Sequence, residues 1–319
     1  QPIGQLDLLK MLGSKVLNYY QDKPAVTNSS RFHHIEALNT LAEVAINQGQ
    51  HDEAKVHLTQ AHLLHKQATM DDNNLFLINQ THYWSGYLAY QQQNWSVAEQ
   101  HWRTYLHNTR TMTHSEPENL EWILEQSYAL NNMGSLMLKQ NQAQQAAEFI
   151  ADSAHLKWQL HQQAPRNTQL LADLSDTISW QAQVMSDNNQ LAKANSLLQE
   201  SLEQAQQLVS LEPNNNQWNH RLALAWYRLS LSYFDLGRLE QAKRHGKSAH
   251  EQFIHLVQID PENLAWNRTL INTATLLAKI KQYSEYNDIW GYTAPNGDEY
   301  AIVGTTTGTA FYNCTDPTS

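Results

Sequence analysis

The sequence has little cysteine, little positive charge and no long apolar run. Its 319 residues include one cysteine, Cys314, which excludes an internal disulfide. Lysine and arginine total 21 against 31 aspartates and glutamates, and the net charge of −10 argues against a surface that binds nucleic-acid phosphates. No apolar run approaches the ~18 residues of a membrane span. With 41% hydrophobic residues, the chain can still bury a large core.

A seven-residue pattern recurs at a fixed period. The copies are Glu116 to Trp122, Glu212 to Trp218 and Asp260 to Trp266, with a degenerate copy at Ala164 to Leu170. The prolines at 117, 165, 213 and 261 are 48 residues apart, and such a period is typical of a solenoid. We interpret each copy as the end of one helix and the start of the next. The proline would occupy the first turn of the new helix, with acidic residues near its positive end.

Small residues mark two helical stretches in every repeat. The second stretch carries Ala54, Ala98, Ala146, Ala194 and Ala242, and twelve residues earlier the first stretch carries Ala42, Gly86, Gly134, Ala182 and Ser230. A tight turn separates the two stretches, for example at Gly49 and at Gly237. This layout resembles the tetratricopeptide repeat (TPR), in which small residues let two antiparallel helices approach closely. The period exceeds the usual length of about 34 residues, so the resemblance implies longer helices.

We therefore predict an all-α fold over residues 1–282, a TPR-like superhelical solenoid of long helical hairpins. Five hairpins should be preceded by one amphipathic helix, over residues 6–20, and followed by one helix, over residues 264–282. The alternative is a plain helical bundle whose similarity to TPR hairpins is accidental.

The last part of the chain, residues 283–319, differs in composition. It has no lysine or arginine and contains four of the eleven glycines. Three strand-like runs surround an Asn296-Gly297 turn, which is a strong hairpin signal. We predict a short C-terminal β segment, separate from the solenoid.

Two further resemblances concern the origin of the chain. The segment from Pro2 to Leu9, with Gly13, Lys15, Leu17 and Tyr19-Tyr20, resembles the start of the TPR region in bacterial membrane-anchored signalling proteins. In those proteins a kinase or DNA-binding module precedes one membrane helix, and the TPR region follows outside. The resemblance implies an extracytoplasmic (periplasmic) location for residues 1–282. Because the chain starts at Gln1 without a signal peptide, we expect it to be a fragment that lacks its membrane anchor.

The tail, about residues 284–319, is similar to the start of LVIVD-repeat proteins, which are secreted proteins of the choice-of-anchor type. The similarity rests on four runs, from Tyr286 to Tyr292, from Glu299 to Gly304, from Gly308 to Phe311 and from Thr315 to Pro317. A β-propeller needs several blades of about four strands each, and this tail amounts to one incomplete blade. The tail is therefore either a fused fragment of a partner, which we favour, or a natural truncation.

No arrangement of residues points to catalysis, so we expect a protein that is not an enzyme and holds no cofactor. The 16 histidines include His62 and His65 on one helical face and His33-His34 near Glu36, but there is no His-Glu-x-x-His run. We interpret them as polar helix faces and expect no metal site. Asp71-Asp72-Asn73-Asn74 lacks the glycine and terminal glutamate of a calcium loop, and Cys314 has no histidine partner nearby.

Aromatic residues on the first helix of each repeat suggest a binding groove. The face expected to line the inside of the superhelix carries Tyr83, Tyr87, Tyr90, Tyr128, Asn131, Ser135, Gln183, Tyr227 and Phe234. Tyrosine combines a large contact area with a hydroxyl group, which suits recognition of an extended peptide. Basic residues are scarce on this face, so it does not match the carboxylate clamp of some TPR proteins. The alternative is that these aromatic residues only pack between helices.

These observations favour a protein- or peptide-binding sensor or scaffold module of an extracytoplasmic signalling protein, one that captures a segment of a secreted or surface protein. Its partner would be a protein or peptide, for example the LVIVD-type parent of the tail, and not a nucleic acid. The tail itself is a candidate ligand for the groove, through Trp290, Tyr292, Phe311 and Tyr312. The alternatives are a docking subunit for an enzyme or chaperone and an architectural assembly factor.

Overall fold

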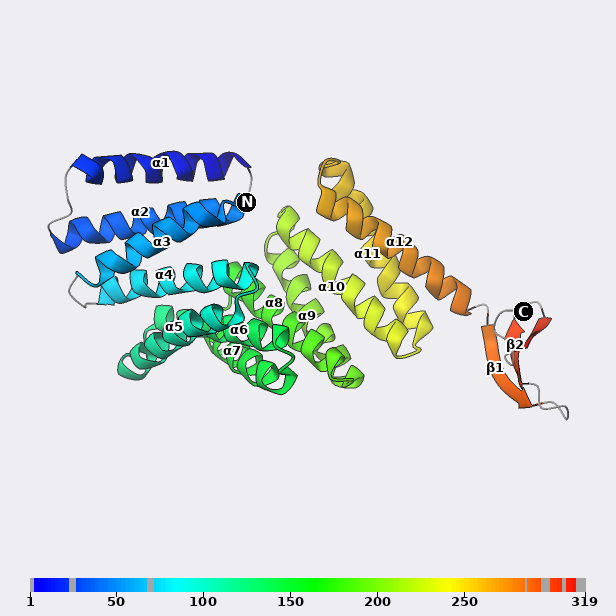
Figure 1. Ribbon diagram of the computed structural model, residues 1–319. Coiled ribbons are helices and arrows are strands. Elements are labelled where there is room, and N and C mark those ends of the chain that lie inside the picture. Colours follow the sequence, from blue (N-terminus) through cyan, green and yellow to red (C-terminus); the bar gives the residue numbers. More distant parts are fainter. Residues whose placement is uncertain are drawn as a thin grey trace. The chain divides into compact units, whose positions relative to one another are not determined.

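The computed structural model describes residues 3–22, 27–67, 72–284, 286–293, 299–305 and 308–313. In these ranges the chain forms twelve α-helices followed by three strands (Figure 1). The helices are α1 (Ile3–Asp22), α2 (Asn28–Asn47), α3 (His51–His65), α4 (Asp72–Gln91), α5 (Trp95–Ser115), α6 (Leu120–Lys139), α7 (Ala143–Gln163), α8 (Thr168–Asp187), α9 (Leu191–Leu211), α10 (Asn216–Asp235), α11 (Leu239–Ile259) and α12 (Leu264–Ser284). None of the described helices is long and apolar enough to cross a membrane.

The chain divides into two compact units. Unit 1 is Gln1–Ala164 and contains α1 to α7, and unit 2 is Pro165–Ser319 and contains α8 to α12 and the strands. The boundary falls within the degenerate copy of the seven-residue pattern, where Leu170 replaces the tryptophan of the other copies. Trp122 and Trp218 are buried at this position, each inside its own unit, whereas Leu170 is half-buried.

The predicted helical hairpins are confirmed. Within the units, α2 packs against α3, α4 against α5, α6 against α7, α8 against α9 and α10 against α11. The helices α6, α8, α10 and α12 begin at Leu120, Thr168, Asn216 and Leu264, so the 48-residue period of the sequence is also the period of the helices. The fold of the solenoid is therefore the predicted all-α one, with a short β segment after it.

Each hairpin turns through one residue with left-handed backbone. These residues are Gly49, Gln93, Asn141, Asn189 and Gly237, with φ between 58° and 73°. Glycine and asparagine adopt this conformation most readily, which explains why most of the turns could be located in the sequence. In the α4–α5 turn, the Asn94 N–H donates to the Ala89 carbonyl at 2.8 Å, and the equivalent bond recurs in the other four turns. This bond satisfies a carbonyl that the end of a helix would leave unpaired.

The prediction that proline occupies the first turn of the next helix was wrong. The helix α6 begins three residues after Pro117, and the proline instead lies in a turn closed by the Asn119 N–H donating to the Glu116 carbonyl at 3.0 Å. Its fixed φ suits the second position of such a turn. Asn119 caps the helix by accepting from the Glu121 N–H, and its own amide donates to the Glu116 carboxylate at 2.8 Å. Asparagine caps the equivalent helices at 167, 215 and 263.

The small residues of the repeats lie where the two helices of a hairpin touch, as predicted. A Cβ on Gly86 would stand 2.3 Å from Nε1 of Trp102, and a Cβ on Gly134 would stand 2.5 Å from Cγ1 of Ile150. In the last hairpin the Ser230 hydroxyl donates to the Ala242 carbonyl across the same contact at 2.6 Å. The glycines therefore make room for the large core side chains of the partner helix.

Three antiparallel strands follow the last helix, in the order β1 (Tyr286–Thr293), β2 (Glu299–Thr305) and β3 (Gly308–Asn313). Ile302 of β2 pairs with Trp290 of β1 and with Phe311 of β3, while Tyr292 pairs with Tyr300 and Tyr312 with Ala301. The predicted β segment is thus present. The Asn296-Gly297 turn lies outside the described residues, and the domain division at 282/283 stays a prediction.

Candidate functional site

A cavity of about 400 Å³ in unit 1 contains part of the predicted groove. It is bordered by side chains of α4, α5 and α6, namely Phe76, Gln80, Tyr83, Trp84, Tyr105, Glu125, Tyr128, Asn131 and Asn132. Three of these, Tyr83, Tyr128 and Asn131, were predicted from the sequence. We call this cavity the aromatic pocket.

Other predicted groove residues of unit 1 have different surroundings. Tyr87 and Tyr90 pack against the hydrophobic core of the unit, and the Tyr90 ring lies 5.4 Å from the rings of both Trp95 and Trp102. Ser135 on α6 is half-buried. The contacts of Tyr90 match the alternative in which the aromatic residues pack between helices, and a binding role for these three residues stays a prediction.

A carboxylate and a phenol form the polar centre of the aromatic pocket. The buried Tyr105 hydroxyl on α5 donates to Oε2 of Glu125 on α6 at 2.6 Å. Burial raises the pKa of Glu125, and burial together with the Glu125 charge raises the pKa of Tyr105. Burial also raises the pKa of Tyr83 to about 12. The pocket thus offers one acidic group, held in place by a hydrogen bond, among aromatic walls.

One wall of the pocket is supported by a buried cation. Lys157 of α7 is almost completely buried, and its Nζ lies 5.0 Å from the centre of the Tyr128 ring. In this cation–π contact the ammonium group is attracted to the face of the ring. Sequence reasoning placed Tyr128 in the groove but did not find Lys157, Tyr105 or Glu125, which lie on other helices or other turns.

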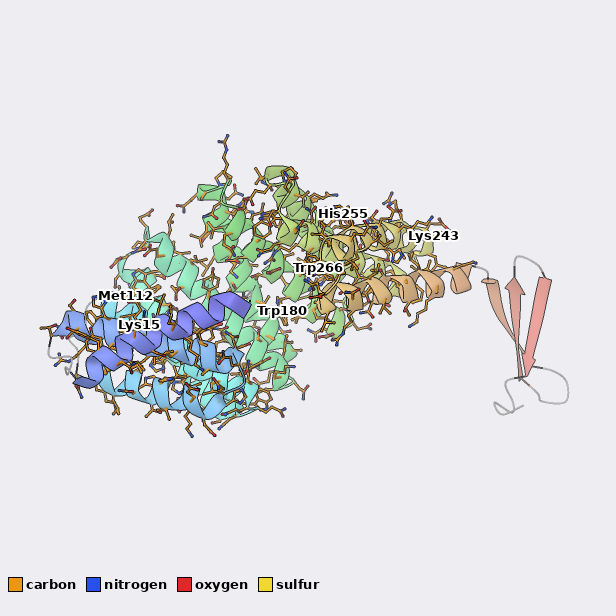
Figure 2. The ribbon with its side chains drawn as sticks, turned by 90° about the horizontal axis from the view of Figure 1, so that it is seen from above. Lys15, Met112, Trp180, Lys243, His255 and Trp266 are labelled. Atoms are coloured by element: carbon orange, nitrogen blue, oxygen red, sulfur yellow. The ribbon has the colours of Figure 1, made fainter. Side chains whose placement is uncertain are left out.

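Unit 2 contains two cavities of about 360 and 440 Å³, and one of its three predicted groove residues, Gln183, borders a cavity. Ser179 and Arg228 border both cavities. Gln183 lines the first, which also reaches Trp180, a side chain that is 52% exposed and labelled in Figure 2. Tyr227 and Phe234 pack against the core of the unit.

Basic residues are less scarce on this face than the sequence suggested. Arg228 borders both cavities of unit 2, and Arg221 borders the second one, where it forms an ion pair with Asp176. The expectation of few basic residues on the face fits the aromatic pocket of unit 1 but not the cavities of unit 2.

The repeat relates the aromatic pocket to the second cavity of unit 2. Two repeats separate Glu125 from Arg221, and the same shift relates Tyr105 to Ser201. Equivalent positions of the solenoid therefore carry opposite charges in the two units.

A histidine cluster lies elsewhere in unit 1. His62 of α3, His82 of α4 and His101 of α5 each offer a ring nitrogen, and these three atoms lie within 4.8 Å of one another. Burial and the neighbouring histidines lower the pKa of His62 to about 4 and that of His82 to about 3, and burial lowers the pKa of His101. All three rings are therefore neutral at pH 7.

Sequence reasoning placed His62 and His65 on one helical face, and their ring centres lie 6.5 Å apart, but it missed the histidine cluster. In the structure the His65 ring contacts the Thr81 hydroxyl at 2.9 Å. The repeat phase could have revealed the cluster, because His82 lies four residues before Gly86 and His101 three residues after Ala98, on facing helices. The predicted His33–Glu36 proximity is real but exposed, with 3.9 Å between the groups. Asp71 and Cys314 lie outside the described residues.

Comparisons with known proteins bear on the fold. The tetratricopeptide repeat family matches residues 223–245, which span the α10–α11 turn. A search of curated proteins returned no match. Among solved structures, BtubC from P. vanneervenii is similar with a TM-score of 0.61 and 10% identity, over 79% of this chain and 91% of that chain. The apo form of RapI is similar with a TM-score of 0.64 and 11% identity, over 88% and 68% of the two chains.

This chain has a TPR-like fold. A third similar structure is a signal-transduction ATPase with numerous domains from Pyrococcus horikoshii, described as having a tetratricopeptide repeat sensor. Its TM-score is 0.61 at 15% identity, and the match covers 87% of this chain but 37% of that one. The TPR-like solenoid of the present protein thus spans about a third of that ATPase, and at such low identities the likeness concerns the fold alone.

Proposed function

We propose that this TPR-like protein binds a protein or peptide segment. The binding surface is formed by the first helices of the hairpins, α4, α6, α8 and α10, on the faces that carry the predicted groove residues. The observation that carries the proposal is the aromatic pocket, where Tyr83 and Tyr128 border a cavity that also exposes a carboxylate, Glu125. Pockets with aromatic walls and one fixed polar group are typical of sites that take a single side chain of a partner. The resemblance of the first twenty residues supports a role as the sensor or scaffold part of an extracytoplasmic signalling protein.

The charge of the aromatic pocket favours a basic side chain of the partner. Glu125 accepts a hydrogen bond from Tyr105, and a carboxylate can accept about four. Burial raises its pKa, so a guanidinium or ammonium group that enters the pocket would stabilise the charged carboxylate. The aromatic rings of Tyr83 and Trp84 would pack on the alkyl stem and face the cation.

The cavities of unit 2 would take side chains of a different kind. Arg221 and Arg228 border them, and Ser179 and Ser201 add hydroxyl groups. An acidic or amide side chain fits these groups. Each unit would therefore select a different kind of partner residue, and a segment from an LVIVD-type secreted protein is one candidate partner. Docking of the chain's own tail on these faces also stays a prediction.

The proposal is tested with a library of extended peptides that differ only at a central position, which is arginine, leucine or glutamate. Binding to the full chain is measured by fluorescence polarisation. We expect Glu125→Gln to weaken the binding of arginine peptides about 10- to 100-fold, the range of a charge-assisted hydrogen bond. The binding of glutamate peptides, which would enter the cavities of unit 2, should not change.

The control is Glu118→Gln, because Glu118 is an exposed acid in the turn before α6 and outside the pocket. It should leave the binding of arginine peptides unchanged. An unchanged affinity of the Glu125→Gln chain for arginine peptides would contradict the proposal, as would an equal effect of the two substitutions.

A further inference from the structure

The histidine cluster carries an inference that is independent of peptide binding. We propose that His62, His82 and His101 form a binding site for a divalent transition metal of the zinc class, with one coordination position open to a neighbouring cavity. Imidazole nitrogen is a favoured ligand of Zn²⁺, Ni²⁺ and Cu²⁺. Three histidines plus one exchangeable ligand is a known arrangement around zinc.

The two nearest nitrogen atoms already face each other. Nδ1 of His82 and Nδ1 of His101 are 3.0 Å apart, and in the neutral rings only one of them can carry the proton of that hydrogen bond. If this proton moves to Nε2 of the same ring, both rings stay neutral and a metal ion can accept the two Nδ1 lone pairs. At the ~2.0–2.1 Å metal–nitrogen distance of zinc sites, nitrogens 3.0 Å apart subtend an angle of about 94° at the ion, and about 3.3 Å would give the tetrahedral angle.

The third ring, His62, lies close to the first two. His62 stacks on His101 with 5.4 Å between ring centres and 22° between planes, and its ring centre lies 4.9 Å from that of His82. With all three nitrogen atoms within 4.8 Å, small side-chain rotations bring them to one ion. The buried Ser85 hydroxyl lies 3.1 Å from Nε2 of His62 and can orient that ring, as hydrogen-bonding groups around metal ligands commonly do.

The three histidines lie on three packed helices, so metal binding would require little further ordering of the chain. The α4–α5 contact that brings His82 beside His101 is the one fixed by Gly86 and Trp102, and Ser85 adjoins that glycine. Metal sites on such packed helices are better preorganised than sites on loops.

The open coordination position would face a cavity. His62 and His101 border a space of about 280 Å³ that Ser85, Lys55 and Thr59 also line, and the aromatic pocket shares none of these residues. The charged groups that act on the pKa of His62 and His82 are other histidines and Lys66. Three neutral ligands leave the dication uncompensated, so the fourth ligand should be an anion such as hydroxide, or azide when supplied.

The test uses the full chain purified without a histidine tag. Cobalt(II) is titrated at neutral pH, and its visible absorption reports coordination, while zinc is added as a competitor. We expect one equivalent to bind and the cobalt spectrum to change when azide is added. Each of His62→Gln, His82→Gln and His101→Gln should weaken binding by at least 10- to 100-fold, since even the loss of an outer-shell partner costs that much.

The matched control replaces three exposed histidines of the same unit, His33, His107 and His155, with glutamine, and it should bind metal as the wild type does. Circular dichroism of each single variant shows whether it has kept its helices. Folded single variants that retain wild-type affinity would overturn the proposal, and so would loss of binding in the control. If the wild-type chain bound cobalt but the cobalt spectrum did not change with azide, the proposal of an open coordination position would be overturned.

Discussion

Gly86 shows how one residue decides the packing of a hairpin. Its missing side chain leaves room for the indole of Trp102, whose Nε1–H donates to the Tyr83 carbonyl at 3.2 Å. Trp102 is one of the largest fully buried side chains among the described residues. A larger residue at position 86 would have to displace this ring or part the two helices.

We predict that Gly86→Ala lowers the free energy of unfolding by about 1–3 kcal/mol, because the new Cβ would lie 2.3 Å from the indole. The loss should occur although alanine favours a helix by about 1 kcal/mol over glycine. Urea denaturation measures it, with the exposed Gln100→Ala on α5 as the control. In a Trp102→Leu background the same glycine substitution should cost much less. An unchanged midpoint for Gly86→Ala would show that the helices do not touch there.

His220 links the stability of unit 2 to pH. The ring lies edge-on to Phe253 at 5.9 Å between ring centres and 6.0 Å from Trp266, which Figure 2 labels. Burial, followed by the charges of Arg221 and Arg228, lowers the pKa of His220 below its usual value. The unfolded chain therefore binds a proton more readily than the folded one.

This histidine should contribute stability above about pH 6.5, the pKa of an unfolded histidine, and lose it as the pH falls towards its lower folded pKa. We predict that His220→Gln reduces the loss of stability between neutral and mildly acidic pH. Urea midpoints at several pH values give the measurement. His255→Gln, a substitution of an exposed histidine on α11, should leave the pH dependence as it is. If both variants behaved alike, the assignment to His220 would fail.

At the scale of elements, the turn between repeats is a small hydrogen-bonded unit. Its capping asparagine donates to an acidic side chain that precedes it and accepts from a backbone N–H of the helix that follows. Asn215 donates to the Glu212 carboxylate at 2.8 Å and accepts from the Gln217 N–H at 3.0 Å. In the turn before α8, the position of the acid is occupied by Ala164. Asn167 instead accepts from two backbone N–H groups of the helix, those of Gln169 and Leu170, both at 3.1 Å. The cap is therefore tied to an acidic side chain in one turn and to the helix alone in the other.

We predict that Asn215→Ala destabilises the chain by about 1 kcal/mol or somewhat more, because it removes a helix cap and leaves the Glu212 carboxylate with fewer donors. Asn167→Ala should cost less, since no carboxylate depends on it. Thermal unfolding compares the two with Asn214→Ala, which alters an exposed residue of the same turn. Equal losses at 167 and 215 would contradict a role for the acid.

At the scale of the whole molecule, stability should be divided between the two units. Each hydrophobic cluster of the described residues draws its members from one unit, for example Trp102 and Leu136 in unit 1 or Leu229 and Ala242 in unit 2. In a solenoid the stability of a segment depends on neighbouring repeats rather than on distant ones.

We predict that residues 1–164 and 165–319, made separately, each fold and unfold cooperatively. The sum of their circular dichroism spectra should match that of the intact chain, with more helix than the third found in ordinary globular proteins. A fragment without helical signal or without a cooperative transition would show that the units depend on each other.

The sequence alone determined the period, the hairpins, the positions of the small residues and the β segment. These features are local, because a turn, a cap or a helix contact is specified by residues at most a few turns apart and is repeated every 48 residues. The repeat pattern was therefore enough to assign Gly134 to a helix contact and Asn141 to a turn. The position of the proline was predicted wrongly, because proline suits both a turn and the first turn of a helix. Here the turn position lies only three residues before the helix begins.

Only the tertiary structure decided which side chains meet. Glu125 pairs with Tyr105 across two helices, and His62 joins His82 and His101 across three. Such meetings depend on the rotation and crossing of each helix, which a one-dimensional pattern does not encode. The same holds for the contacts of Tyr90 with Trp95 and Trp102, because the depth of a side chain is set by the neighbours that cover it.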